Sequence, residues 1–254
     1  MKNILITAGP TNEYIDEVMK ITNMSTGRLG IELTRNFLES GEQVTLIGTR
    51  NIFRSGLFEK YHLATNPNLR SIPIETTQDM YLALEQESKN KYDLVIHSSA
   101  VGDYKPDFTF RMEDLAEELS KAYVYGMTEP EQILKILTNP KCKVDDNTKI
   151  SSYEPNLTVK LTLTPKLISH LREWYQDATI VGFKLLENVT KEHLLGVAKK
   201  LCVKNNVDYI IANDLADLRQ GTHLSFLVNQ DGYQNTEFHS PEDIYEKTKT
   251  MIKK

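Results

Sequence analysis

The chain has 254 residues, two cysteines and a formal net charge of -5 at pH 7. This length can bury a sufficient core without disulfides, and two distant cysteines without CxxC spacing argue against a structural zinc site and favour a reducing, cytoplasmic compartment. Because the sequence has no basic patch, signal peptide or apolar stretch of membrane-spanning length, we expect no nucleic-acid partner and no membrane partner, but an enzyme of small-molecule metabolism.

The first fifty residues predict a βαβ unit. Residues 4–6 and 43–49 have the short apolar runs of buried strands, and apolar side chains recur at helical spacing over residues 30–41. Further strands are expected at 92–100, 178–183 and 207–214, and further helices at 76–90, 165–176 and 187–206. Short strands that alternate with helices indicate an α/β fold with a Rossmann-like, doubly wound and mostly parallel sheet.

Residues 108–165 interrupt this alternation. They hold two helical stretches and then two runs of alternating polar and apolar residues, which we expect to pair as strands. The helical stretches are 111–126 and 129–141, and the alternating runs are 148–154 and 156–163. The segment is interpreted as an inserted β-rich flap or dimerisation subdomain within one α/β domain that spans residues 1–254.

Polar residues gather where the predicted strands end, in TAGPT, IGTR, HSSAVGDYKP, VGFKLLE and ANDLADLRQG. Binding sites in parallel sheets lie beyond the carboxyl ends of the strands, so these segments hold the candidate site. The last predicted element is a hairpin over residues 223–239 that turns at Asp231-Gly232.

Two loops near the N-terminus are candidates for phosphate binding. In TAGPT, backbone N–H groups around Gly9 and Thr11 can approach phosphate oxygens, although turn geometry alone also explains one glycine. The segment NMSTGRLG then places hydroxyls, a glycine and a cation at a helix start, as Ser25, Thr26, Gly27 and Arg28. This segment is either a helix N-cap or a second loop that holds an anion.

Familiar nucleotide motifs are absent from the sequence. There is no GxGxxG, the strand at 43–49 ends without the acidic residue that holds a dinucleotide ribose, and no GxxxxGK[ST] is present. An NAD(P)-dependent short-chain oxidoreductase remains an alternative because Tyr245 and Lys249 have its YxxxK spacing, but we expect this pattern on a helix surface. A non-catalytic nucleotide sensor on the same sheet is a further alternative.

The motifs TAGPT, ITNMSTGRLG, SSAVGDYKP, VGF and VDYIIAND, with Asp16 and the lysine of TKI, occur in the order seen in phosphopantothenate–cysteine ligase, also called phosphopantothenoylcysteine synthetase. The sequence resembles this family over nearly its whole length. It resembles the stand-alone bacterial form, because no flavin-dependent decarboxylase portion precedes the motifs, and no flavin is expected.

The resemblance implies a two-step reaction in coenzyme A biosynthesis. The carboxylate of 4′-phosphopantothenate attacks the α-phosphate of CTP to give an acyl-cytidylate and pyrophosphate, and the amine of L-cysteine then displaces CMP. Bacterial members generally use CTP and eukaryotic members ATP. Mg²⁺ is expected to accompany the nucleotide, and a homodimer is expected because family members are dimers.

The resemblance also implies roles for single residues. Asn23 matches the asparagine that handles the acyl intermediate, and Lys149 matches the first lysine of a lysine-rich flap motif, where its charge assists carboxylate activation. The flap motif reads KISS over residues 149–152, which loses two cations. Pro10 replaces a glycine of the first loop and removes one N–H donor.

Further matches concern the nucleotide. The resemblance places Asp103 and the backbone around Ala100 at the ribose and base, Phe183 beside the base, and the i,i+4 pair Lys200 and Lys204 at the phosphates. No metal ligands are assigned, since none of the six histidines has metal-ligand spacing.

Several of these residues have simpler explanations. Lys149 can be a solvated strand lysine, Lys200 and Lys204 can belong to a charged helix face, and Asp103 can close a turn. His97, inside a predicted strand, is expected to be a packed or hydrogen-bonded core residue.

Overall fold

The structure, a computed structural model, describes residues 1–144, 149–151 and 153–252. The chain folds into two compact units. Unit 1 comprises Met1–Thr11, Asn23–Val101 and Pro165–Lys254, and unit 2 comprises Asn12–Thr22 and Gly102–Thr164. The short segment Asn12–Thr22 was expected to lie within the first βαβ unit, but it belongs to unit 2.

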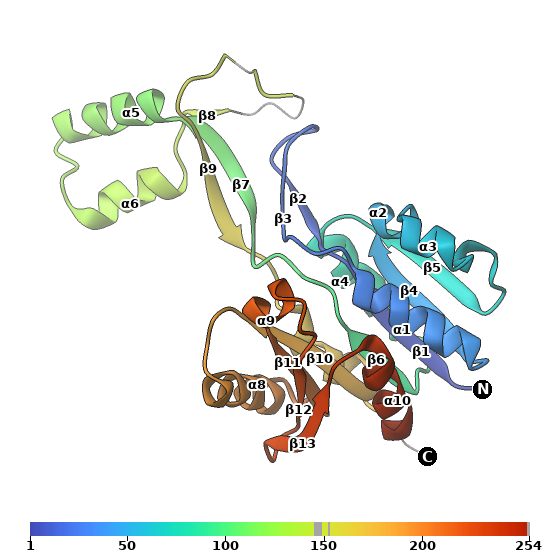
Figure 1. Cartoon of the computed structure of the whole chain (residues 1–254). Coiled ribbons are helices and arrows are strands. Elements are labelled where there is room, and N and C mark those ends of the chain that lie inside the picture. Colours follow the sequence, from blue (N-terminus) through green and yellow to red (C-terminus); the bar gives the residue numbers. More distant parts are fainter. Residues whose placement is uncertain (145–148, 152, 253–254) are drawn as a thin grey trace. The chain divides into compact units, whose positions relative to one another are not determined.

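Unit 1 is built around a sheet of eight strands in the order β13-β12-β11-β10-β6-β1-β4-β5 (Figure 1). The strands are β1 (Asn3–Ala8), β4 (Gln43–Thr49), β5 (Leu69–Ile74), β6 (Leu94–His97), β10 (Thr179–Leu186), β11 (Tyr209–Asp214), β12 (Ser225–Val228) and β13 (Tyr233–Phe238). Neighbours from β5 to β11 are parallel, whereas β12 and β13 are antiparallel. This arrangement confirms the predicted α/β class, its mostly parallel sheet and its C-terminal hairpin.

Helices cover both faces of this sheet, because the central strands are apolar on both sides. One face is packed by α1 (Arg28–Glu39) and α10 (Pro241–Met251), and the other by α4 (Thr77–Glu87), α7 (Leu171–Trp174) and α8 (Lys191–Asn205). The remaining short helices of unit 1 are α2 (Arg50–Phe53), α3 (Gly56–Lys60), η1 (Leu63–Thr65), η2 (Leu167–Ser169) and α9 (Leu215–Arg219).

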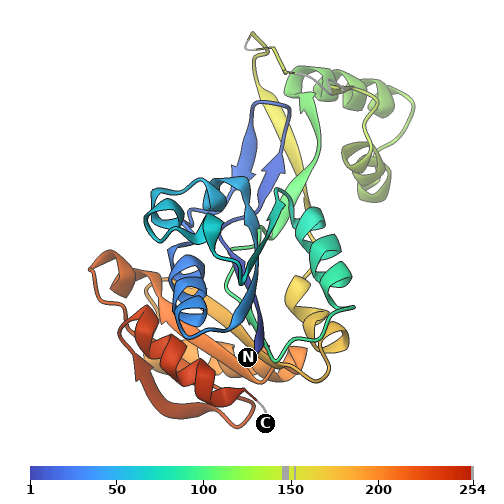
Figure 2. The same ribbon diagram turned by 90° about the vertical axis from the view of Figure 1, so that its right-hand side faces the viewer.

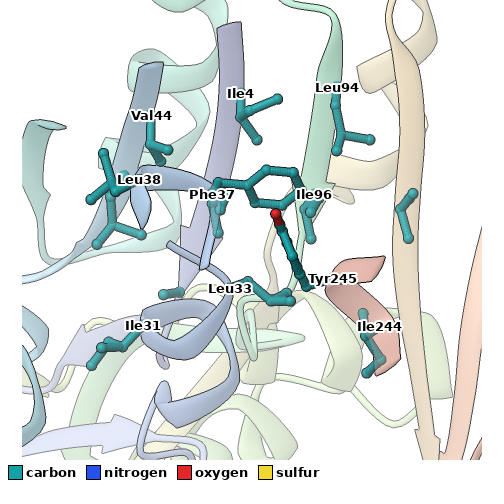
Figure 3. Packing of buried hydrophobic residues seen from close by; sticks show 14 of the residues in the cluster. Ile4, Ile31, Leu33, Phe37, Leu38, Val44, Leu94, Ile96, Ile244 and Tyr245 are labelled. Carbon is teal, nitrogen blue, oxygen red and sulfur yellow. The ribbon is translucent and has the colours of Figure 1, made fainter. Parts of the chain in front are cut away.

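The core between β1, α1 and α10 is drawn in Figure 3. The rings of Phe37 on α1 and Tyr245 on α10 meet edge to face with centroids 4.9 Å apart, in the same buried cluster as Ile4 of β1. Tyr245 is 8% exposed, so the expectation that the YxxxK segment lies on a helix surface is wrong for this tyrosine. Its ring is buried because α10 packs directly on α1.

Residues 165–176 were predicted as one helix, and the structure replaces it with η2 and the single turn α7. The guanidinium of Arg172 donates to the carbonyls of Tyr175, Gln176 and Ala178 at 3.0–3.2 Å. These hydrogen bonds satisfy carbonyl groups outside a helix, so the chain can leave α7 and turn into β10 at little cost.

In the part of unit 2 that the structure describes, the chain forms a three-stranded sheet, two helices and a short hairpin. Its elements are β2 (Asn12–Tyr14), β3 (Lys20–Thr22), β7 (Tyr104–Arg111), α5 (Met112–Val124), α6 (Pro130–Thr138), β8 (Lys143–Val144) and β9 (Leu157–Leu163). The long strands β7 and β9, green and yellow in Figure 2, pair antiparallel, and α5 and α6 lie beyond one end of this ladder.

The expected pairing of the two alternating runs is wrong. The run at 156–163 forms β9, but β9 pairs with β7 and not with the described residues of the run at 148–154. In the run at 148–154, residues 148 and 152 lie outside the described part of the chain, and the described residues form no strand. The N–H of Ile150 is instead bonded to the side chain of Asp16, at 3.0 Å, which removes it from any ladder.

Candidate functional site

The loops that follow β1 and β6 run side by side at the carboxyl edge of the unit 1 sheet. The N–H of Ala100 donates to the carbonyl of Gly9 at 2.9 Å, and the N–H of Thr11 donates to the carbonyl of Ala100 at 3.4 Å. Gly9 has φ 79°, a conformation that favours glycine. Thr11 is fully buried, and its hydroxyl lies 3.0 Å from that of Thr77. The structure therefore brings Gly9, Thr11 and Ala100 together.

Asn23 is fixed against the second of these loops. Its Nδ2 donates to the carbonyls of Ala100 and Val101 at 3.2 and 3.1 Å. Both partners can only accept hydrogen bonds, so the amide nitrogen must face them and Oδ1 must face away. The side chain is exposed, and Oδ1 is thus presented as an acceptor with a defined direction.

The N-terminus of α1 begins four residues later. Gly27 is its N-cap with φ 68°, so the N-cap residue itself has no side chain to accept a hydrogen bond, and the first turn holds no acidic residue. The hydroxyls of Ser25 and Thr26 accept from the N–H groups of Gly27 and Arg28 at 3.3 and 3.4 Å. The positive end of a helix without an acidic side chain favours a bound anion.

The two candidate phosphate loops touch through their glycines. A Cβ atom on Gly27 would lie 2.3 Å from Cδ1 of Ile52 and 3.0 Å from Cα of Gly9. Only glycine therefore allows this approach of the two backbones, which gives Gly27 a steric reason beyond turn geometry. Arg28 is largely exposed, and its Nε lies 3.6 Å from the Glu32 carboxylate, one turn along α1.

Phe183 lies at the same edge, on β10. The preceding residue, Gly182, pairs with His97, the last residue of β6, so Phe183 begins the part of β10 that extends beyond β6. Its partly buried ring packs on the core cluster that includes α1. Phe183 therefore lies on the α1 face of the sheet, at the edge where the two loops meet.

Lys200 and Lys204 are exposed on α8 and lie elsewhere. Because α8 leads from the carboxyl end of β10 to the amino end of β11, Lys204 in its last turn lies at the amino edge of the sheet. Lys199 beside them donates to the carbonyl of Asp231 in the β12–β13 turn, also at that edge. The structure does not bring this pair to the carboxyl edge, and its phosphate role stays a prediction.

Asp103 and Lys149 belong to unit 2. The carbonyl of Asp103 accepts from the N–H of Thr164 at 3.1 Å, where the β7–β9 ladder ends, and its side chain is exposed. Lys149 is exposed and lies outside any strand, next to the buried Ile150. The part of the flap motif at Ser152 lies outside the described residues.

His97 was expected to be a core residue, and the structure confirms this. It is 7% exposed, and its Nδ1 lies 2.9 Å from the hydroxyl of Thr7, which also accepts from the N–H of Ser99. The hydroxyl of Ser98 donates to the carbonyl of Thr7 at 2.6 Å. These bonds hold the start of the Ala100 loop against β1, a contribution that the strand pattern of the sequence did not indicate.

Burial lowers the pKa of His97 from 6.5 to about 4. As the pH falls below 6.5, the unfolded chain takes up a proton that the folded chain does not, which costs the folded state about 1.4 kcal/mol per pH unit. Between pH 7 and 5, we expect urea unfolding to show a smaller loss of stability in His97→Gln than in the wild type, by about 2 kcal/mol. His193 is exposed, so His193→Gln serves as control. An equal loss of stability in all three proteins would contradict the lowered pKa of His97.

Among the residues that the structure describes, no group of three His, Cys, Asp or Glu side chains could hold a metal ion. Within the same residues, no helix has the length and apolarity needed to span a membrane.

Comparison with known proteins identifies the family. The model of the DNA/pantothenate metabolism flavoprotein C-terminal domain matches residues 1–144. A solved structure described as the DNA/pantothenate metabolism flavoprotein from Streptococcus pneumoniae is 32% identical, covers 99% of this chain and 98% of its own, and superposes with a TM-score of 0.78.

Two further comparisons concern a curated relative and a second solved structure. The coenzyme A biosynthesis bifunctional protein CoaBC of Thermococcus kodakarensis is 29% identical over 231 residues, which are 91% of this chain and 45% of that protein. The chain thus spans about half the length of the curated relatives it matches. A Cab2 mutant in complex with phosphopantothenate-cysteine shares the fold, with a TM-score of 0.61, 18% identity and coverage of 98% of this chain and 87% of its own. The chain therefore belongs to the family of the DNA/pantothenate metabolism flavoprotein C-terminal domain, the phosphopantothenoylcysteine synthetase family that its motifs indicated.

Proposed function

We propose that the chain joins 4′-phosphopantothenate to L-cysteine in coenzyme A biosynthesis, with CTP as the activating nucleotide. The observation that carries this proposal is the oriented amide of Asn23, four residues from the glycine N-cap of α1. The acceptor Oδ1 of Asn23 suits an amine that attacks an acyl group, and the helix N-terminus suits a phosphate chain. A protein that only senses nucleotides needs the second feature and not the first.

The first chemical step requires an anion to attack a polyanion. A carboxylate oxygen of phosphopantothenate forms a bond to the α-phosphorus of CTP, the bond to the β-phosphate bridging oxygen breaks, and pyrophosphate leaves. Positive charge lowers this barrier. We assign the charge to the α1 N-terminus around Gly27 and to the ammonium of Lys149.

In the second step the amine of cysteine attacks the activated acyl carbon, a C–N bond forms, CMP leaves and the nitrogen loses a proton. A fixed acceptor beside the amine orients its lone pair toward the carbon. The Oδ1 of Asn23 can accept such a hydrogen bond, because the Nδ2 atom is held by the carbonyls of Ala100 and Val101.

The nucleotide site is proposed to use both loops at the carboxyl edge. Gly9, Thr11, Ser25, Thr26 and Gly27 would lie at the phosphates, and Ala100 and Phe183 at the ribose and base. Arg28 is proposed from its charge at the start of α1, whereas Asp103, Lys200 and Lys204 are proposed from the resemblance alone. Mg²⁺ would arrive bound to the triphosphate, as is usual where the protein supplies no cage of carboxylates.

We further propose that the protein is a cytoplasmic homodimer that associates through unit 2. Unit 2 has many exposed apolar side chains, and no described residue of α6 is buried. They include Tyr123, Val124, Tyr125, Leu134 and Leu137. Exposed apolar surface of this kind favours association. Light scattering that returned the mass of a single chain would contradict the dimer.

Purified protein is expected to release pyrophosphate when supplied with CTP, Mg²⁺, 4′-phosphopantothenate and L-cysteine. Release should require phosphopantothenate, since its carboxylate is the nucleophile. Without cysteine, release should stop near one equivalent per site, because the acyl-cytidylate cannot turn over. Replacing CTP by ATP in parallel reactions tests the nucleotide preference.

The outcomes separate the possible functions. Nucleotide binding without pyrophosphate release from CTP or ATP would contradict the ligase and favour a sensor. Turnover with ATP alone would retain the ligase and contradict the CTP assignment.

A further inference from the structure

The carboxylate of Asp16 joins two distant segments of unit 2. Its Oδ1 accepts from the N–H groups of Val18 and Met19 at 2.8 and 2.6 Å, and its Oδ2 accepts from the N–H of Ile150 at 3.0 Å. Asp16 is 7% exposed. The backbone donors, first Met19 and then Ile150, hold the pKa of Asp16 below its ordinary value, so the group is charged at neutral pH.

The first pair of bonds closes the turn between β2 and β3, where the N–H of Ile15 also donates to the carbonyl of Met19 at 2.9 Å. The third bond reaches residue 150, far along the chain. Ile150 is 4% exposed, so its side chain and its N–H are both fixed. Lys149 directly precedes Ile150 and is exposed. The hydrogen bond of the Ile150 N–H therefore fixes the backbone next to Lys149.

The hydrogen bonds of Asp16 do not involve the ammonium group of Lys149. Both oxygens of Asp16 are occupied by N–H donors, and no ion pair joins Lys149 to a residue that the structure describes. The backbone hydrogen bonds and, to a smaller extent, the charge of Lys149 lower the pKa of Asp16, whereas burial raises it. The carboxylate of Asp16 thus interacts electrostatically with the ammonium of Lys149 without forming a direct ion pair.

We infer that Asp16 is a positioning residue for Lys149, acting through the N–H of Ile150. The inference rests on the proposed function, in which Lys149 supplies charge to the activation step. An asparagine cannot replace the aspartate, because its NH₂ group would face an N–H donor at one of the two oxygen positions. A displaced cation about 1 Å from its place can cost about 100-fold in rate.

The test is a double-mutant cycle between Asp16→Asn and Lys149→Ala, read as kcat for pyrophosphate release. We expect D16N to lower kcat by about 10-fold to 100-fold while the KM for CTP changes less than about threefold. In the K149A background, D16N should cause no further loss, because it acts through the same lysine.

A matched control is available in the same unit. The carboxylate of Glu118 accepts from the N–H groups of Lys141 and Cys142 and joins α5 to a distant segment in the same way, but it does not touch residues 149–150. E118Q should leave kcat within about twofold of wild type. Hydrogen exchange of the Ile150 amide adds a readout that does not depend on activity, with protection expected in wild type and lost in D16N.

The outcomes are separable. A wild-type protein that releases no pyrophosphate would overturn the proposed function. An active wild type and a D16N variant with the same kcat would overturn only the role of Asp16. Multiplied losses in the double mutant, or equal losses in D16N and E118Q, would show that Asp16 acts on general stability. If D16N does not fold, an unprotected Ile150 amide in the wild type would still contradict the inference.

Discussion

An Asn23→Ala variant is expected to lose about 100-fold to 1,000-fold in kcat for amide formation, the range found when one preorganised polar group is removed from a reacting centre. The KM for CTP should change less than about threefold, because the N-terminus of α1 and its hydroxyls stay in place. Pre-steady-state pyrophosphate release and formation of the amide product, followed separately, would locate the loss in the second step.

Two variants serve as controls for Asn23. Asn23→Asp keeps the shape but places an anionic oxygen about 3 Å from the carbonyls of Ala100 and Val101, a repulsion that costs at least as much as truncation. Met24→Ala, in the same loop, removes a side chain that is 96% exposed and should leave kcat within about twofold of wild type. A normal rate in Asn23→Ala would remove this residue from the site.

A Lys149→Ala variant is expected to lose about 100-fold or more in the rate of the first step, because a cation that faces developing phosphate charge is removed. The measurement is the burst of pyrophosphate with CTP and phosphopantothenate, without cysteine. Lys149→Arg keeps the charge and should recover part of the burst rate.

The control for Lys149 is Lys143→Ala, which removes another lysine of unit 2, whose Nζ donates to Asn139 at 2.8 Å. Its burst should match the wild type. If Lys149→Ala lowers the rate of the second step and leaves the burst intact, the lysine does not serve activation. Asp16 would then position Lys149 for amide formation and not for the activation step.

The sheet of unit 1 was predictable because its signals are local. Strands buried on both faces require unbroken apolar runs, and these runs mark β1, β4 and β6 in the sequence. The helix α1 has apolar residues at helical spacing, and Asp231-Gly232 gives the β12–β13 turn its geometry. Each feature depends on residues that are neighbours along the chain.

The errors concern contacts between distant segments. Alternation marked β9 as a strand but could not identify β7 as its partner, since many strands satisfy the same pattern. Tyr245 has the polar neighbours of a surface residue and is buried only because α10 packs on α1. Likewise, the i,i+4 spacing of Lys200 and Lys204 fixes a shared helix face and not the edge of the sheet at which that face lies.

The same division holds for the candidate site. The motifs of the sequence were enough to indicate the family and to make Asn23 and the glycines of the two N-terminal loops candidate site residues, because each motif places a residue type at a fixed position. Only the tertiary structure decided that the amide of Asn23 faces the carbonyls of Ala100 and Val101, that Gly27 lies against Gly9, and that Asp16 holds Ile150. Such contacts depend on distances between segments far apart in sequence, which periodicity and spacing do not encode.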